Sequence, residues 1–333
     1  MSTTAQPDPP TPGIGVSARA VRSLGRPTPI QLQQYALIAV VIVLLIVGTI
    51  LKPDTFLNAN NFRAIFTQAS VVGVLAIGMT FVIATAGIDL SVGSIVAAAG
   101  VAAGLVIDSG AVVFVFAALG FGLLLGTVNA TMIAFGKVVP FIATLAMLAI
   151  ARGLALQMSD KQPISLLDSD GVRWFGTGKI LGQPVSVIIF LGITVLGWVM
   201  LNRTRYGRHV VSVGGNREAA RIAGVPVRRT IFSVYCMSGF LAGLAAILLS
   251  GRLASASPVS GQLLELDAIG ATVIGGTSLA GGRATIGGTF LGVIIFAIIF
   301  NLLTQLNLAT EWQQIVKGVI ILAAVLIQRP ERL

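Results

Sequence analysis

The sequence is poor in the residues that build metal sites, disulfides and acid–base catalysts. It has one cysteine, Cys236, and one histidine, His209, among 333 residues. A single cysteine excludes a disulfide within the chain and a cysteine-based metal centre. A single histidine excludes any site that needs two imidazoles, including the zinc-binding HExxH motif. An intramembrane enzyme would need a nucleophile–base or metal constellation, and one histidine with one cysteine argues against that class.

Charged residues are also scarce. Asp, Glu, Lys and Arg make up 10% of the chain, against about 25% in ordinary globular proteins. Hydrophobic residues reach 55%, and the mean hydropathy is +0.94. A soluble fold cannot cover so much apolar surface with so few charges. The composition predicts an all-α integral membrane protein, in which the 39 glycines let helices approach closely in lipid.

Motifs that bind nucleotide phosphates are missing. Gly136-Lys137 is followed by valine and Gly178-Lys179 by isoleucine, so neither pair completes a GxxxxGK[ST] loop. The GxSxG motif of hydrolases is also absent from the sequence. We therefore expect no enzymatic activity and no cofactor or metal in this chain. If the protein moves a solute uphill, ions or another polypeptide must supply the energy.

Ten apolar runs approach the length of a membrane span, about 20 residues. Several are rich in glycine, so their boundaries are soft and eight spans is an alternative count. The expected domains are a disordered, proline-rich tail at 1–34, a transmembrane domain at 35–328 and a short tail at 329–333. The ten runs are 35–51, 69–86, 91–107, 111–135, 138–156, 185–201, 230–250, 263–280, 286–303 and 312–328.

The distribution of Lys and Arg predicts the orientation. With the N-terminus inside and ten spans, fourteen basic residues fall on the inner side and six on the outer side. The rule that positive loops stay in the cytoplasm then places both termini there. The loop 202–229 decides the count, since it holds seven arginines and one glutamate, whereas the longest outer loop, 158–184, is balanced. The basic balance therefore indicates membrane topology rather than binding to nucleic acid.

The basic inner loop contains a short capped helix in the stretch 214–226, GGNREAARIAGVP. Asn216 can cap the helix, Glu218 suits its first turn, and Gly224 can close it in a left-handed conformation before Pro226. The predicted helix has about two turns. We expect one face to carry small residues that let another surface approach, and arginines to flank that face. The small residues are Ala219, Ala220 and Ala223, and the arginines are Arg217 and Arg221.

Glu218-Ala219-Ala220 followed by Gly224 resembles the coupling-loop motif of ABC-importer permeases, although the downstream Leu-Pro pair of that motif is missing. Four longer stretches resemble the permeases of ribose-type sugar importers in residues, order and spacing, so the resemblance covers roughly 54–328. The chain departs from these permeases at Val139-Pro140, where they usually have Pro-Pro, and at Asn301-Leu302, where they often have Asn-Gly. The stretches are GMTFVIATAGIDLSVGS (78–94), PFIATLAMLAIARGLA (140–155), GRHVVSVGGNREAARIAGV (207–225) and LLELDAIGATVIGGTSLAGG (263–282).

This resemblance implies a subunit that pairs with a second copy or a sister permease in the bacterial inner membrane. A periplasmic binding protein would deliver a monosaccharide of the ribose, xylose or galactose kind. A separate ATPase subunit, which holds ATP and Mg²⁺, would drive transport through alternating access. The helix at 216–224 would then sit in a groove of that ATPase.

Polar residues within the apolar runs are candidates for the substrate pathway. Asp89 lies in a glycine-rich break, where an acid suggests function, or where it accepts hydrogen bonds from the turn while Ser91 caps the next helix. Hydroxyl groups suit a many-hydroxyl substrate but also bond to their own helices. The candidates are Thr80, Asp89, Ser91, Asn129, Thr144, Thr272, Thr277 and Ser278.

Four charged residues are expected near the outer ends of spans. Glu265 and Asp267 would contact water or the binding protein there, and Arg152 and Lys317 would extend to the interface. With so few charges inside the spans, a neutral polyol is favoured over an amino acid as the substrate. Import of nucleosides or branched-chain amino acids is the nearest alternative, and ion-driven secondary transport, which would need carboxylates on a coupling path, is a more distant one.

Overall fold

The computed structural model describes residues 29–327, and helices dominate that part of the chain. Helices occur at all ten predicted runs. They are α1 (Pro29–Leu51), α2 (Ala59–Ala84), α3 (Val92–Gly104), α4 (Ala111–Ala134), α5 (Pro140–Met158), α7 (Val185–Arg203), α10 (Val227–Leu253), α11 (Leu264–Ile274), α12 (Ile286–Gln305) and α13 (Thr310–Ile327). The short elements are η1 (Ile107–Ser109), β1 (Ile164–Ser165), α6 (Asp170–Thr177), β2 (Lys179–Ile180), β3 (Gln183–Pro184), α8 (Arg205–Gly215), α9 (Arg217–Ile222) and β4 (Ser255–Ala256).

Seven of the helices in this part of the chain are long and apolar enough to cross a membrane: α1, α2, α4, α5, α7, α10 and α12. Two others are short, because α3 has 13 residues and α11 has 11. At 1.5 Å per residue these two helices are about 20 Å and 16 Å long, less than the roughly 30 Å hydrocarbon core. The glycine-rich runs therefore form helices that end inside the bundle, as expected of glycine-interrupted spans. Of the tails predicted at 1–34 and 329–333, residues 1–28 and 329–333 lie outside the described residues, whereas 29–34 form the start of α1, so the first tail was predicted too long.

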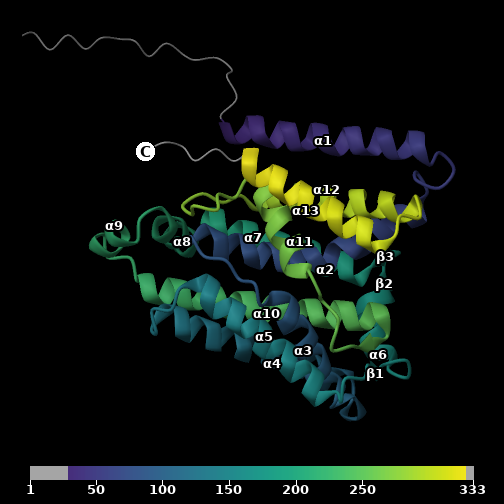
Figure 1. The fold of residues 1–333 in the computed structure, drawn as a ribbon, viewed down its shortest axis with the longest axis horizontal. Coiled ribbons are helices and arrows are strands. Elements are labelled where there is room, and N and C mark those ends of the chain that lie inside the picture. The colour runs from purple at the N-terminus through teal and green to yellow at the C-terminus, as the bar shows by residue number, and fades with distance from the viewer. Residues whose placement is uncertain (1–28, 328–333) are drawn as a thin grey trace, which may run out of the picture.

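The helices lie side by side in one bundle, with α1 along one edge and α4 along the opposite edge in Figure 1. Most of α2 and α10 is buried, whereas α1, α4, α5 and α7 expose much of their apolar surface. The two central helices also pack against each other. This arrangement puts the core around α2, α3, α10 and α12, and leaves much of the surface of the outer helices uncovered by this chain.

Helices α4 and α10 approach each other through glycine. A Cβ atom on Gly126 would lie 2.7 Å from the Cα of Gly239, and one on Gly239 would lie 2.5 Å from the Cα of Gly126. One turn along, a Cβ on Gly122 would lie 2.8 Å from the Cα of Gly243, and one on Gly243 would lie 2.5 Å from the carbonyl oxygen of Ala118. Close backbone contact of this kind replaces the hydrophobic effect as the source of helix association in lipid.

The short elements gather at the two ends of the bundle. Helices α8 and α9 lie at one end, on the left of Figure 1, where α1 begins and α13 ends. Helix α6 and the β-strands lie at the other end, where β1 pairs with β4 and β2 with β3. The predicted inner loop 202–229 and the predicted outer loop 158–184 therefore occupy opposite ends of the molecule.

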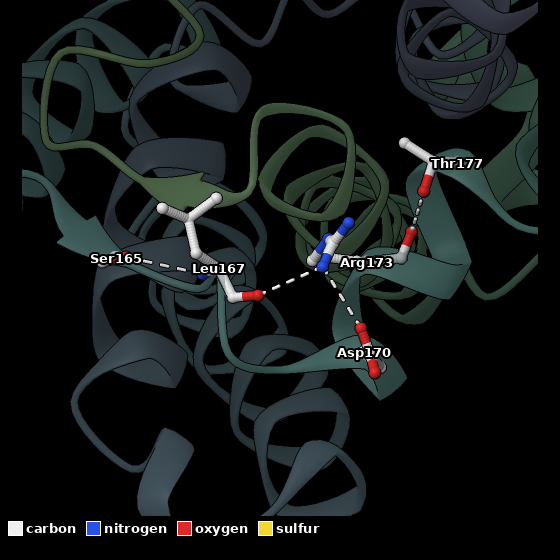
Figure 2. A network of polar contacts seen from close by, with 5 residues as sticks. All are labelled: Ser165, Leu167, Asp170, Arg173 and Thr177. Atoms are coloured by element: carbon white, nitrogen blue, oxygen red, sulfur yellow. Dashed lines mark hydrogen bonds and ion pairs between the residues drawn. The ribbon is translucent and has the colours of Figure 1, made fainter.

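The loop 158–184 has a defined local structure. Arg173 of α6 donates to the carbonyl of Leu167 and to Asp170, both at 3.2 Å, and Thr177 donates to the carbonyl of Arg173 at 3.0 Å (Figure 2). The Arg173–Asp170 pair is exposed and so adds little stability. The strands and α6 instead fix the shape of this end.

Candidate functional site

Helix α9 forms at the predicted place with the predicted caps. The side chain of Asn216 accepts from the amide of Ala219 at 2.9 Å, and Gly224 adopts a φ of +78° just beyond the helix. Arg221 donates to Glu218 through Nε at 3.1 Å. This hydrogen bond, together with the charge of Arg221, lowers the pKa of Glu218 below its usual value. At six residues, α9 is shorter than the expected two turns.

The face of α9 that is free differs from the predicted one. Ala220 is buried against the core of its own chain, so it cannot belong to a face open to another protein. Ala219 and Ala223 are exposed, and between them stands Ile222, whose side chain is 78% exposed. The exposed face therefore consists of Ala219, Ile222 and Ala223. The sequence signal that was missed is an isoleucine in a basic, water-facing loop.

Helices α8 and α9 meet two breaks in the helical bundle. Arg217 donates to the carbonyl of Thr85, just after α2, at 3.4 Å. The amide of Gly282, in the glycine-rich loop 275–285, donates to the carbonyl of Ala84 at 3.0 Å. A Cβ on Gly214 of α8 would overlap that same carbonyl oxygen. We call this meeting of 84–87, 214–217 and 281–282 the inner joint.

Asp89 is fully buried and is held by neutral donors. Its Oδ1 accepts from the amide of Ser91 at 3.0 Å and from the hydroxyl of Ser91 at 2.6 Å. Its Oδ2 accepts from Ser238 of α10 at 2.8 Å, and Asn129 of α4 donates to the Ser91 hydroxyl at 2.9 Å. We call these four side chains the Asp89 network. Sequence reasoning missed Ser238, which lies 149 residues from Asp89.

Ser91 does not cap α3 through its side chain, so that expectation was wrong. Its hydroxyl bonds to Asp89 instead, because the turn folds the carboxylate back over residue 91. Thr144 of α5 belongs to the same region and donates to the carbonyl of Ile88 at 3.2 Å. The predicted residues Asp89, Ser91, Asn129 and Thr144 thus converge on one break.

The predicted threonines on α2 and α11 join helices elsewhere. The hydroxyls of Thr80 and Thr289 lie 2.8 Å apart and link α2 to α12. Thr272 donates to the carbonyl of Ala76 at 3.2 Å and links α11 to α2. Thr277 and Ser278 lie in the loop 275–285, where the hydroxyl of Thr277 accepts from the amide of Thr285. The eight candidates therefore do not form a single site, and most of them are buried between helices of one chain.

The four charged side chains lie deeper than predicted. The segment 257–263 turns inward and runs beside α3: Ala256 is next to Gly104, and Gly261 is next to Gly93. Gly104 is eleven residues along α3 from Gly93, so α11 begins about 16 Å from the end of α3 that is predicted to face outward. Glu265 is adjacent to Gly93 at this depth. Glu265 and Asp267 are therefore not at the outer surface.

The two basic residues have partners instead of extending to the interface. Lys317 of α13 pairs with Asp267 at 2.7 Å, with side chains only 14% and 11% exposed, and its ammonium lies 5.1 Å from the ring centre of Phe300. Arg152 of α5 donates from Nη1 to the carbonyls of Pro258 and Ser260. Hydropathy gives the length of an apolar run but not the depth at which a helix starts. The partners of Lys317 and Arg152 were therefore not predicted from the sequence.

Taken together, these features define an all-α, multi-pass membrane protein with interrupted helices and an exposed capped helix at one end. The profile of the family described as branched-chain amino acid transport system / permease component matches residues 61–325. The chain belongs to this permease family.

Named relatives narrow the comparison. The chain is 42% identical over 306 residues to the ribose import permease protein of Escherichia coli strain K12, covering 90% of this chain and 95% of that protein. It is 43% identical over 290 residues to the ribose import permease protein of Bacillus subtilis strain 168, covering 86% and 90%. The D-allose transport system permease protein of Escherichia coli strain K12 is 37% identical over 282 residues, covering 84% and 86%. The resemblance noted in the sequence is therefore confirmed.

Proposed function

We propose that this chain is the permease subunit of an ATP-driven importer that moves a monosaccharide of the ribose, xylose or galactose kind into the cytoplasm. The observation that carries the proposal is the match to ribose import permeases over about nine-tenths of the chain.

The energy would come from an ATPase subunit docked on α9. The exposed face of Ala219, Ile222 and Ala223 offers one large apolar side chain between two small ones, as a helix that enters a groove requires. The buried side chain of Ala220 anchors α9 on the permease, and α9 follows α8 with only Asn216 between them, so a push on Ile222 moves α9 and α8 together. The inner joint then carries that displacement to the end of α2 and to the loop 275–285.

The remaining partners follow from the two ends of the bundle. The end with α8 and α9 would face the cytoplasm with both termini, and the end with α6 and the β-strands would receive the periplasmic binding protein. A second copy or a sister permease would cover part of the exposed lateral surface in the inner membrane. Cysteine substitutions at Leu181 and Ile222, in a Cys236→Ser background, test the orientation: an impermeant thiol reagent should label only the first in intact cells.

Docking on α9 is tested by Ile222→Arg, with Leu181→Arg as the matched control. Leu181 is 98% exposed and lies at the opposite end of the molecule, between β2 and β3. Ile222→Arg should abolish ATPase co-purification and sugar uptake at normal permease levels, whereas Leu181→Arg should retain ATPase co-purification. Normal co-purification of Ile222→Arg would show that α9 is only a surface turn.

The energy source is tested in proteoliposomes. Labelled ribose should accumulate only with the ATPase, the binding protein, ATP and Mg²⁺ present. Accumulation driven by a proton or sodium gradient without an ATPase would replace this proposal by ion-driven transport.

Import of a branched-chain amino acid is the second candidate. The description of the family names it, and Arg152 and Glu265 both lie beside the segment 257–263: Arg152 donates to the carbonyls of Pro258 and Ser260, and Glu265 and Gly261 both lie next to Gly93. Such a pair could meet the carboxylate and ammonium groups of an amino acid. Competition for uptake between labelled ribose and unlabelled leucine distinguishes the two candidates.

A further inference from the structure

One lateral surface of the bundle is polar at a depth where lipid would surround it. Gln262 is exposed and Glu265 is partly exposed, and they lie beside Gly93, about 16 Å along α3 from Gly104, which is roughly half of a 30 Å hydrocarbon core. Arg152, which donates to the carbonyls of Pro258 and Ser260 in the segment that leads there, is also partly exposed. Exposed residues within other helices include large apolar side chains: Leu124 of α4, Val195 of α7 and Leu322 of α13 are each more than half exposed. A charged group against lipid at this depth is costly and normally faces a water-filled cavity or another protein surface.

Helix α5, which carries Arg152, has small exposed residues close to that side chain. Along one stripe of the exposed side of α5, the inner half carries Ile142 and Leu145 and the outer half carries Ala149 and Gly153, with Ile150 and Leu154 exposed beside the stripe. A Cβ on Gly153 would meet no atom within 4 Å. The surface at Gly153, the residue after Arg152, is therefore open, while Ile142 and Leu145 narrow the same stripe further in.

We propose that Arg152, Gln262 and Glu265 line the sugar pathway at the junction with the second permease copy and contact the hydroxyl groups of the sugar. We call these three side chains the α5–α11 patch. This inference rests on the proposed function, and it assigns the sugar contact to residues other than the buried ones singled out in the sequence. The sugar passes over the patch and then meets Leu145 and Ile142, where an apolar constriction closes the path.

The chemistry of the patch suits a polyol. Both bonds that Arg152 makes to carbonyl oxygens use Nη1, and a guanidinium has further donors on Nε and Nη2. Glu265 supplies acceptors, and the amide of Gln262 supplies both kinds of group. Adjacent hydroxyls of a sugar donate and accept together, so a mixed set of this kind holds them without a net charge.

The patch predicts that residue 262 is in contact with water although it lies at membrane depth. The variant is Gln262→Cys in the Cys236→Ser background, within the assembled importer. The control is Val195→Cys in the same background, because Val195 is 63% exposed and about 15 Å from the outer end of α7. The probe is a charged, water-soluble methanethiosulfonate, applied alone, with excess ribose or with excess leucine.

The thiol of Gln262→Cys should react at least an order of magnitude faster than the thiol of Val195→Cys, and ribose should slow that reaction while leucine does not. If Gln262→Cys reacts as slowly as Val195→Cys, in a protein that still imports ribose, the patch is overturned and the proposed function stays intact. A fast reaction that neither solute slows also overturns the patch, because the sugar then passes elsewhere. Protection by leucine alone keeps the patch as the pathway and refutes the proposed sugar substrate.

Discussion

Asp89 and Asp267 occupy related places in the two halves of the chain and are held in different ways. Asp89 lies three residues before the short helix α3, and Asp267 lies in the first turn of the short helix α11. Helix α3 packs against α4, α5 and α10, and α11 packs against α12, α13 and α2. Asp89 is bonded by hydroxyl and amide donors, whereas Asp267 is paired with the ammonium of Lys317.

The difference implies two mechanical roles. Hydroxyl groups rotate and exchange partners at low cost, and two groups near Asp89, Asn129 Oδ1 and Tyr235 Oη, have no partner among the described residues. An ion pair cannot separate inside the bundle without leaving two uncompensated charges. We therefore assign the Asp89 network to the part that rearranges during transport, and the Asp267–Lys317 pair to the part that holds α13 on α11.

The largest expected effect comes from breaking the ion pair on one side. Lys317→Met leaves Asp267 buried without a counter-charge and should lower the free energy of unfolding by about 3–5 kcal/mol. Thermal unfolding in detergent measures the loss. The double variant Asp267→Leu/Lys317→Met removes both charges and should recover most of the lost stability. If it does not, the ion pair itself stabilises the fold, beyond each charge compensating the other.

The inner joint should be the next most sensitive place. Gly214→Ala puts a Cβ against the carbonyl of Ala84 and should cost about 1–3 kcal/mol through forced backbone shifts. The variant should also uncouple ATP hydrolysis from sugar uptake, because Ala84 leads directly into the loop that carries Asp89. Gly287→Ala is the control, since its Cβ would meet only Gln34, at 3.8 Å. If ATP hydrolysis and sugar uptake are coupled equally well in both variants, the inner joint plays no part in the mechanism.

A smaller loss of stability is expected when one hydrogen-bond donor is removed from the Asp89 network. Ser238→Ala removes one donor to Asp89 and leaves the two from Ser91, so it should cost about 1 kcal/mol in stability. Sugar uptake should fall by more than this loss of folded protein explains. Thr131→Val serves as the control, because that exposed hydroxyl bonds to Thr127 of its own helix. Uptake reduced only in proportion to folded protein would make Ser238 a structural residue.

The smallest effect on stability and uptake is expected at Glu218, whose carboxylate is exposed, unlike those of Asp89 and Asp267. The hydrogen bond from Arg221 holds the pKa of Glu218 below its usual value. The folded-state pKa is thus the lower one, so the contribution to stability is full above the unfolded-state pKa and is lost as the pH falls through the folded-state pKa. Because the pair is exposed and screened, Glu218→Gln should leave unfolding and uptake unchanged near neutral pH. A clear loss of ATPase binding in Glu218→Gln would mean that the partner contacts this carboxylate directly.

Much of this architecture is predictable from the sequence, and the failures share a physical cause. Hydropathy and glycine content give ten helices in the right order, and the caps Asn216 and Gly224 give the position of α9. Which side of α9 faces inward depends on how α8 docks, so Ala220 was placed wrongly. The depth of Asp267 depends on an inward-running segment with no hydrophobic signature of its own. Its pairing with Lys317 joins residues 50 positions apart, which local patterns do not predict.

The most direct test of the two roles is sugar uptake by Asp267→Leu/Lys317→Met compared with Asp89→Asn. Both are measured in the assembled importer at matched amounts of folded protein. The account predicts uptake close to that of the unmodified protein in the double variant, because a rigid contact has been replaced by another rigid contact. It predicts a large loss in Asp89→Asn, because the carboxylate that Ser91 and Ser238 share has gone. Loss of uptake in the well-folded double variant, or normal uptake in Asp89→Asn, would contradict it.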